Sequence, residues 1–268
     1  MSSIPINNRS VVVIATENYL EELAITVLNV AKYLPDDIDL VILVDFESPF
    51  LDKIKLLHKN IKFKKINKER YKELSFENPW RKWQYNCGYR FEIFTMSEYE
   101  KICYIDLDII IKDNFIDIFN FEGDACFCLN RLGSIPEFKN AIGFNAGICT
   151  LSKKYLTQEM VDKLISIAAR KDYTSDEAVL FSFFGNKYTV IPREYNTVTT
   201  YINSPEDYDK AKIIHFIGHS KPWNGSVSSS FDEYVVRLIG LVNCRFLYTK
   251  YKEYKQKSLQ ELKSYGVY

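Results

Sequence analysis

Short apolar runs alternate with segments of helical periodicity in the first part of the chain, and this alternation limits the possible folds more than any other feature. Residues 11–15, 39–44 and 61–66 are typical of buried strands. Between them, apolar residues recur at helical spacing over 20–34, and an amphipathic segment lies near 50–58. Parallel strands need crossover helices, so the βαβαβ order predicts an α/β protein with a parallel, doubly wound sheet.

The same alternation continues through most of the chain. We expect further strands at 101–106, 125–129, 144–151, 188–191 and 212–217. We expect helices at about 89–99, 157–170 and 176–184, and a loop over one face of the sheet at 67–88. The tail from Phe231 is helical in pattern, and no change in composition separates domains before about residue 225. The sequence therefore predicts one main domain over 1–230 and a helical tail over 231–268.

Composition excludes several classes of partner. Lys plus Arg number 35 and Asp plus Glu number 35, so the chain has no net charge that would attract nucleic acid or an anionic membrane. No apolar run reaches the roughly 20 residues of a transmembrane helix, and the first ten residues do not resemble a signal peptide. The six cysteines show no CxxC spacing, and free thiols suit a reducing compartment. We expect a cytoplasmic protein, and the tyrosines of the tail could mediate a homodimer.

The chain lacks the glycine motifs that hold phosphates in the common nucleotide folds. Thr16-Glu17-Asn18-Tyr19 follows the first predicted strand, where a dinucleotide fold requires GxGxxG. The P-loop pattern GxxxxGK[ST] is also absent from the sequence. A bound nucleotide therefore needs another means of holding its phosphates, and a divalent metal with carboxylate ligands is the obvious alternative.

Two aspartates end the predicted strand at 101–106. Because residues i and i+2 of a strand point the same way, Asp106 and Asp108 should converge on one cation at the carboxyl edge of the sheet. The alternative is a turn with two solvated acids, but turns usually contain Gly, Pro or Asn, and isoleucines flank this motif. Phosphatases of the haloacid-dehalogenase type also use DxD, with the first Asp as nucleophile. In those enzymes the motif normally follows the first strand, whereas here at least three strands precede it.

Several motifs then occur in a fixed order: Thr16-x-x-Tyr19, Arg90, DxD at 106–108, FNAG at 144–147, DE at 176–177, IPxxYN at 191–196 and HFxGxxKPW at 215–223. This order resembles glycosyltransferase family 8, the glycogenin and bacterial galactosyltransferase group, over residues 10–225. The resemblance implies the GT-A nucleotide-diphospho-sugar transferase fold, with a Rossmann-like, mostly parallel sheet and flanking helices. It also implies a UDP-sugar donor and Mn²⁺ (or Mg²⁺).

The resemblance further implies a role for each matching residue. The implied metal ligands are Asp106, Asp108 and His215. The implied donor contacts are Thr16, Tyr19, Arg90, Asp106, Leu107, Gly218 and Lys221. The implied catalytic group is Asn145, Asp176 and Glu177. Glu177 departs from the glutamine usual in the family, and it could stabilise an oxocarbenium-like centre, act as a nucleophile, or reflect a different donor sugar.

The sequence thus predicts a metal-dependent, retaining glycosyltransferase that transfers a hexose from a UDP-sugar to a hydroxyl of a glycan or protein. The retaining outcome follows from the family resemblance, as does front-face attack assisted by a diphosphate oxygen. Two alternatives stay open at this point: the DxD phosphatase, and a catalytically degenerate module that binds a sugar nucleotide.

Overall fold

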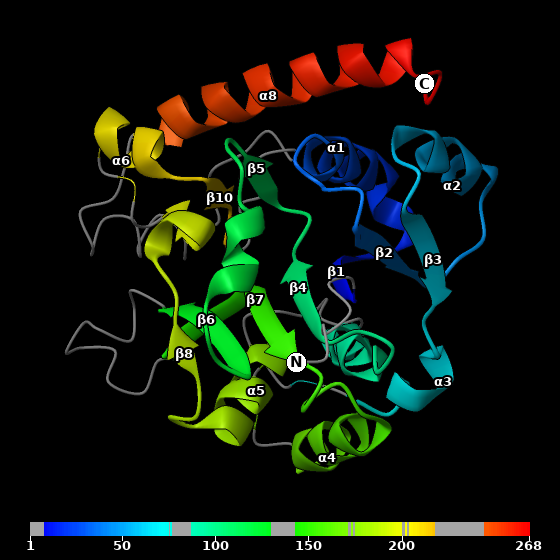
Figure 1. Cartoon of the computed structure of the whole chain (residues 1–268), viewed down its shortest axis with the longest axis vertical. Helices are drawn as coiled ribbons and strands as arrows, with labels where there is room; N and C mark the ends of the chain where they lie inside the picture. The colour runs from blue at the N-terminus through cyan, green and yellow to red at the C-terminus, as the bar shows by residue number, and fades with distance from the viewer. Residues whose placement is uncertain are drawn as a thin grey trace, which may run out of the picture.

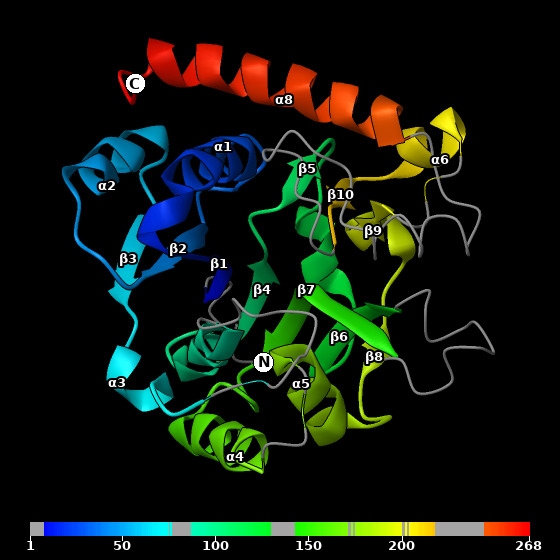
Figure 2. The same ribbon diagram turned by 180° about the vertical axis from the view of Figure 1, so that it is seen from behind.

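A seven-stranded sheet forms the centre of the molecule, with helices on both of its faces (Figures 1 and 2). The structure is a computed structural model, and it describes residues 8–74, 76, 87–129, 143–170, 173, 175–199, 202, 204–217 and 244–268. Gly218 and Lys221, two of the predicted donor contacts, lie outside the described residues.

The strand order of this sheet is β3-β2-β1-β4-β7-β6-β8. Its strands are β1 (Arg9–Ala15), β2 (Ile38–Val44), β3 (Ile61–Lys65), β4 (Lys101–Ile105), β6 (Ala125–Leu129), β7 (Phe144–Ser152) and β8 (Thr189–Val190). Only β7 runs against its neighbours, because it pairs antiparallel with both β4 and β6, whereas the remaining pairs are parallel. The predicted mostly parallel sheet is confirmed.

A second, three-stranded sheet lies at the end of β4. It consists of β5 (Ile109–Ile111), β10 (Ile213–His215) and β9 (Thr197–Val198), in the order β5-β10-β9. β10 runs antiparallel to β5 and parallel to β9. The sequence pattern did not predict β5 or β9.

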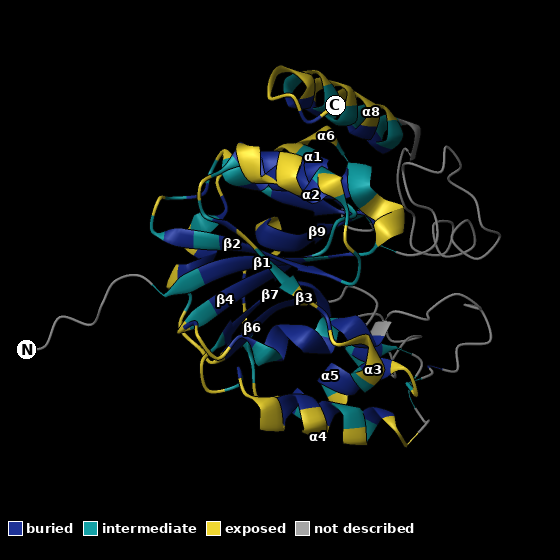
Figure 3. Cartoon of the chain, turned by 90° about the vertical axis from the view of Figure 1, so that its right-hand side faces the viewer, coloured by how far each residue is buried: buried dark blue, intermediate teal, exposed yellow. Residues whose placement is uncertain are grey.

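Helices form the outer layers. The α-helices are α1 (Leu20–Ala31), α2 (Pro49–Ile54), α3 (Lys68–Tyr71), α4 (Gln158–Ala168), α5 (Asp176–Phe184), α6 (Pro205–Lys210) and α8 (Cys244–Ser264). The 3₁₀ segments are η1 (Glu17–Tyr19), η2 (Lys55–Leu57), η3 (Cys87–Thr95), η4 (Ile116–Asn120) and η7 (Arg193–Asn196). Figure 3 shows α1, α2 and α8 on one side of the sheet, and α3, α4 and α5 on the other.

Two buried clusters hold these layers together. One packs residues of α1 and α2, such as Leu23, Val27 and Ile54, against the sheet. The other packs η3, α4 and α5 against the opposite face, with Phe91 and Leu180 fully or almost fully buried. Each cluster removes a continuous apolar face from water, which is the main stabilising contribution in a layered α/β domain.

Helix α8 lies across α1 along one edge of the molecule (Figure 1). Asn29 of α1 donates to Ser258 Oγ over 2.9 Å in a buried contact, and Lys32 forms a 2.7 Å ion pair with Glu261. None of the described helices combines the length and apolar character needed to span a membrane. The division at residue 230, the cytoplasmic location and the homodimer stay predictions.

Three predicted elements need correction. The helix expected at 89–99 is the 3₁₀ segment η3, which ends at Thr95. The segment 67–88, expected as a loop, contains the short helix α3, and residues 77–86 lie outside the described part of the chain. The helix expected over 20–34 ends at Ala31, before Pro35.

Candidate active site

The chain crosses from the large sheet to the small one at Asp106, Leu107 and Asp108. β4 ends at Ile105 and β5 begins at Ile109, so the two aspartates lie in a bend and not on a strand, as the strand period had suggested. The backbone N–H of Asp106 donates to the carbonyl of Gly147 on β7 over 2.8 Å, and the carbonyl of Asp108 accepts from the N–H of Phe216 over 2.8 Å. Each aspartate is therefore held by a different sheet.

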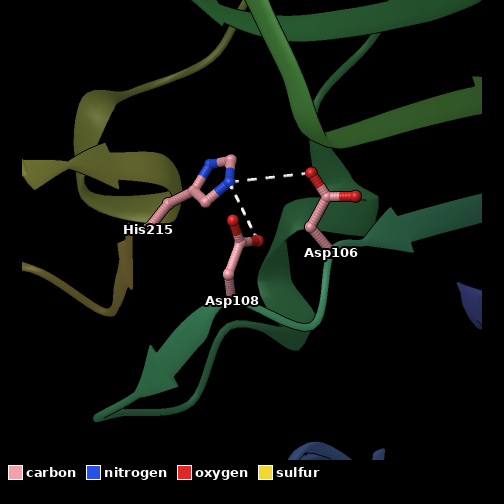
Figure 4. Close-up of side chains that lie close together, drawn as sticks. All are labelled: Asp106, Asp108 and His215. Atoms are coloured by element: carbon pink, nitrogen blue, oxygen red, sulfur yellow. Dashed lines mark ion pairs between the residues drawn. The ribbon is translucent and has the colours of Figure 1, made fainter. Parts of the chain in front are cut away.

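His215 ends β10 and completes the cluster. It pairs with Ile109 of β5, which brings its ring beside Asp108. The Nε2 atom of His215 lies 3.2 Å from Asp108 Oδ1 and 3.6 Å from Asp106 Oδ2 (Figure 4). One ligand atom from each residue lies within 4.8 Å of the others, so the three side chains predicted as metal ligands converge.

The residues fit a divalent cation both in chemistry and in space. Two carboxylates and one imidazole suit Mn²⁺ or Mg²⁺. A Cβ atom at Gly147 would lie 2.1 Å from His215 Cε1 and 2.7 Å from Asp106 Oδ2, so only glycine lets β7 approach the cluster this closely. The sequence motif contained Gly147, but only the structure shows that the missing side chain leaves room for His215 and Asp106.

Arg90 links the metal cluster to α5. Its Nη2 atom lies 3.1 and 3.2 Å from the two carboxylate oxygens of Asp106, and its Nη1 atom lies 3.0 Å from Asp176 Oδ2. Burial alone would lower the pKa of Arg90, but the two carboxylates raise that pKa well above its ordinary value. The guanidinium is therefore permanently charged and orients both acids.

Tyr104 is a further contact that the sequence did not indicate. Its hydroxyl donates to Asp106 Oδ1, and its ring lies beneath the Arg90 guanidinium, 5.5 Å from ring centroid to Cζ. Burial, reinforced by Asp106, raises the pKa of Tyr104. The hydroxyl therefore stays protonated and remains a donor to the carboxylate.

The first turn of α5 supplies two more acids. Ser175 caps this helix by accepting from the N–H of Ala178, and Asp176 and Glu177 follow in the first turn, where the helix dipole favours negative charge. Glu177 Oε2 accepts from the N–H of Ala146 on β7 over 2.7 Å. Burial is the main cause that raises the pKa of Glu177 to about 7, although the Ala146 hydrogen bond and Arg90 lower it.

Arg90 supplies positive charge to three acids of the site. It contacts Asp106 and Asp176, and its charge also acts to lower the pKa of Glu177. A cation held between Asp106, Asp108 and His215 would add positive charge on the other side of Asp106.

Asn145 and Asn196 lie on the other side of His215. His215 Nδ1 lies 3.0 Å from Asn196 Oδ1, and Asn196 Nδ2 donates to Asn145 Oδ1 over 2.8 Å. All three side chains are buried. The family resemblance placed Asn145 in the implied catalytic group and included Asn196 only in the IPxxYN motif, so the bond between Asn196 and the histidine was not predicted.

The predicted nucleotide contacts lie at the same edge of the sheet. Thr16 follows β1, which runs parallel to β4, and Tyr19 ends η1 with 42% of its surface exposed. The carbonyl of Leu107 accepts weakly from the Thr26 hydroxyl at 3.5 Å. Thr16 and Tyr19 thus share the carboxyl edge with the aspartates, and their contact with a donor stays a prediction.

A mostly parallel sheet with an acidic metal cluster at its carboxyl edge is the architecture of GT-A glycosyltransferases. The family model "Glycosyl transferase family 8" matches residues 10–226, which is most of the chain. The chain therefore belongs to glycosyl transferase family 8, a family of glycosyltransferase enzymes. This membership confirms the family resemblance and decides against the phosphatase alternative.

Individual relatives agree with this assignment. The chain is 25% identical over 160 residues to glycosyltransferase GlyA of Streptococcus pneumoniae serotype 4 (strain ATCC BAA-334 / TIGR4), covering 56% of this chain and 23% of GlyA. It is 27% identical over 175 residues to galactinol synthase 6 of Arabidopsis thaliana, covering 54% and 50% of the two chains. The chain thus spans between about a quarter and a half of the length of these curated relatives.

A solved structure shows the same fold. The galactosyltransferase LgtC, in complex with donor and acceptor sugar analogues, superposes with a TM-score of 0.66 at 18% identity, covering 87% of this chain and 96% of LgtC. This likeness confirms the predicted GT-A fold, and GT-A glycosyltransferases use a divalent metal and a nucleotide sugar.

Proposed function

We propose that this protein is a retaining glycosyltransferase that transfers a hexose from a UDP-sugar to a hydroxyl group of a glycan or protein, with Mn²⁺ held by Asp106, Asp108 and His215. The observation that carries the proposal is the convergence of these three ligands at the carboxyl edge of the sheet, where open α/β folds bind their ligands. The names of the matched proteins support a sugar as the transferred group, because they include galactinol synthase 6 and the galactosyltransferase LgtC.

The proposed reaction breaks the bond between the anomeric carbon and the diphosphate oxygen, and the bonding electrons leave with UDP. A hydroxyl oxygen of the acceptor forms the new bond on the same face, and its proton passes to a diphosphate oxygen. When bound, Mn²⁺ would supply positive charge to the leaving diphosphate. Lys221, which lies outside the described residues, is proposed to add a second positive charge, and Gly218 a backbone contact.

The protein's own groups are proposed to orient the donor sugar. Arg90 fixes Asp176 at the start of α5, so this carboxylate can accept from hydroxyl groups of the sugar. Asn145 keeps its Nδ2 donor free of partners among the described residues, and that donor is proposed to contact the sugar. Thr16 and Tyr19 are proposed to contact the uracil and ribose.

Glu177 occupies a position that is usually glutamine in the family. Because Oε2 already accepts one hydrogen bond from the Ala146 N–H, Oε1 keeps the larger part of the group's acceptor capacity for a substrate. We propose that Glu177, which is ionised above a pH of about 7, then stabilises positive charge at the anomeric carbon or selects a different donor sugar, because a carboxylate accepts but does not donate hydrogen bonds.

A donor screen tests the proposed function. The purified protein is incubated with UDP-glucose, UDP-galactose, UDP-N-acetylglucosamine or GDP-mannose, with and without Mn²⁺, and both its melting temperature and the release of nucleoside diphosphate are measured. We expect one UDP-sugar to raise the melting temperature only with Mn²⁺ and to release UDP slowly. NMR of the transferred product should show the same anomeric configuration as the donor.

Three other results would contradict the proposal in different ways. Preferential use of GDP-mannose would reject the UDP donor. An inverted product would reject the retaining mechanism. Absence of any response to nucleotide sugars and acceptors would favour the catalytically degenerate alternative.

A further inference from the structure

A bulge in β7 frees a backbone donor beside the metal cluster. The consecutive β6 residues Phe127 and Cys128 pair with Cys149 and Asn145, so three β7 residues lie between the two paired positions. Bulges of this kind often redirect side chains at functional sites. The N–H of Gly147, inside the bulge, donates to Asn145 Oδ1 over 3.0 Å.

This backbone N–H fixes the orientation of two side-chain amides in turn. A backbone N–H can only donate, so the Asn145 atom that faces it must be the carbonyl oxygen. Asn196 approaches the same oxygen at 2.8 Å and must therefore present its Nδ2 donor. The other end of the Asn196 amide, Oδ1, then faces His215 Nδ1 at 3.0 Å.

An oxygen acceptor beside Nδ1 determines which nitrogen of the imidazole carries the proton. Asn196 Oδ1 can only accept, so Nδ1 must carry a hydrogen, and Nε2 is the atom left to face Asp106 and Asp108. Metal-binding histidines generally have such a partner on the other ring nitrogen, which orients the ring and fixes its tautomer.

We propose that Asn145 and Asn196 are positioning residues that transmit the orientation of the Gly147 N–H to His215 and keep Nε2 available to the metal. This proposal rests on the metal site of the proposed function. Asn196 is fully buried, and Asn145 and His215 are 8% and 3% exposed, so water cannot easily replace a lost partner. If the side-chain amide of Asn145 or Asn196 rotated by half a turn, its oxygen and nitrogen would exchange places. Two donors or two acceptors would then face each other in these contacts.

Metal affinity of matched variants tests the proposal without measuring transfer. The free Mn²⁺ concentration is followed by electron paramagnetic resonance during titration of the full chain. Asn196→Leu removes the acceptor and should weaken Mn²⁺ binding about 10- to 100-fold, as expected for loss of an outer partner of a ligand. Asn145→Ala frees the Asn196 amide to turn over and should also weaken binding.

Asn145→Asp is the conservative variant. A carboxylate keeps the acceptor that Gly147 and Asn196 use, so Mn²⁺ affinity should not fall. The same variant lacks the Nδ2 donor and should raise the KM for the donor sugar if that donor contacts it. Asn29→Leu is the control, because Asn29 is a buried asparagine on α1 that bonds to α8 and not to the site.

The tautomer itself can be observed in the unaltered protein, whose asparagines are all intact. The chain has three histidines, and replacing His58 and His219 in turn identifies the ¹⁵N signals of His215 by elimination. In the Mg²⁺-loaded protein, Nδ1 should carry the proton and Nε2 should not. A protonated Nε2 with a bare Nδ1 would overturn the proposal.

The outcomes separate this proposal from the proposed function. If the unaltered protein binds no divalent metal, the proposed metal site itself is wrong. If it binds metal and Asn196→Leu binds equally well, the metal site stands and the positioning role is wrong. If Asn145→Asp loses as much affinity as Asn145→Ala, the shared acceptor is not what holds His215.

Discussion

Replacing Gly147 with alanine should disrupt the metal cluster more than any other change of a single methyl group. The added Cβ would lie 2.1 Å from His215 Cε1, whereas carbon atoms in contact are about 3.5–4.0 Å apart. Either the ring or β7 must move by about 1.5 Å to restore that spacing. His215 is buried and bonded to Asn196, so the ring cannot move without losing that bond.

The magnitude follows from these contacts. Overpacking of a tight interior typically costs about 1–3 kcal/mol, so the free energy of unfolding should fall by that amount. Loss of an outer partner weakens metal binding about 10- to 100-fold. Displacement of the ligand itself should cost no less, so we expect Mn²⁺ affinity to fall at least about 10-fold. Urea denaturation and Mn²⁺ titration of Gly147→Ala measure the two effects.

Gly266→Ala is the matched control. Gly266 has a φ of +74°, and a Cβ there would meet no atom within 4 Å. Alanine in this left-handed conformation costs about 1–2 kcal/mol, so stability should fall without loss of Mn²⁺ binding. The reasoning is refuted if Gly147→Ala binds Mn²⁺ as tightly as the unaltered protein, or if both variants lose metal affinity equally.

Three further predictions concern the buried polar groups. Burial raises the pKa of Glu177 from 4.5 to about 7, so the folded protein binds this proton more tightly than the unfolded chain, and the resulting stability is lost as the pH rises through 7. Glu177→Gln keeps an acceptor for Ala146 and should raise the free energy of unfolding at pH 8 by about 3 kcal/mol, from 1.36 kcal/mol per pH unit; parallel pH profiles of the two proteins would contradict this. Arg90→Met removes the ion-pair partner of buried Asp176 and should cost about 3 kcal/mol in urea denaturation of the metal-free protein. A cost below 1 kcal/mol would show that Asp176 does not depend on Arg90. Asn29→Ala removes the buried bond to α8 and should cost about 1–3 kcal/mol, whereas unchanged stability would mean that α8 contributes little through this contact.

The sequence predicted the elements that carry a strong local signal. The β-branched runs at 11–15 and 39–44 are strands of the central sheet, and the helical periodicity after Leu20 is α1. The carboxyl edge was located correctly because the apolar run before Asp106 is β4. The sequence predicted an α-helix at 89–99 where the structure has the 3₁₀ segment η3, and the shortness of η3 explains this error. Over nine residues, apolar residues that repeat every 3.0 positions are hard to distinguish from ones that repeat every 3.6 positions.

The geometry of the aspartates could not be predicted in the same way. The segment from Lys101 to Ile111 is almost continuously apolar and gives no sign that it belongs to two sheets. Pairing of β5 with β10, about one hundred residues later in the sequence, pulls Asp108 toward His215. Convergence of the two carboxylates was therefore expected for the wrong reason, and a bend produces it instead of strand alternation.

The supporting contacts depend on long-range packing. Gly147 has a role because β7 meets the end of β10, and Asn196 has a role because η7 lies beneath the same histidine. Local propensity describes neither contact. The motif at 144–147 marked the segment as important, but only the fold distinguishes a glycine that leaves room for a ligand from one that permits a turn.

Binding of UDP, the part shared by all UDP-sugars, tests the central claim most directly. UDP is titrated calorimetrically into the protein with Mn²⁺, with a chelator, and into Asp108→Asn with Mn²⁺. The metal cluster predicts tight binding in the first titration and little or none in the other two, because the diphosphate then lacks its bridging cation. Equal UDP affinity in all three titrations would contradict the assignment of Asp106, Asp108 and His215 as the metal site that holds the donor.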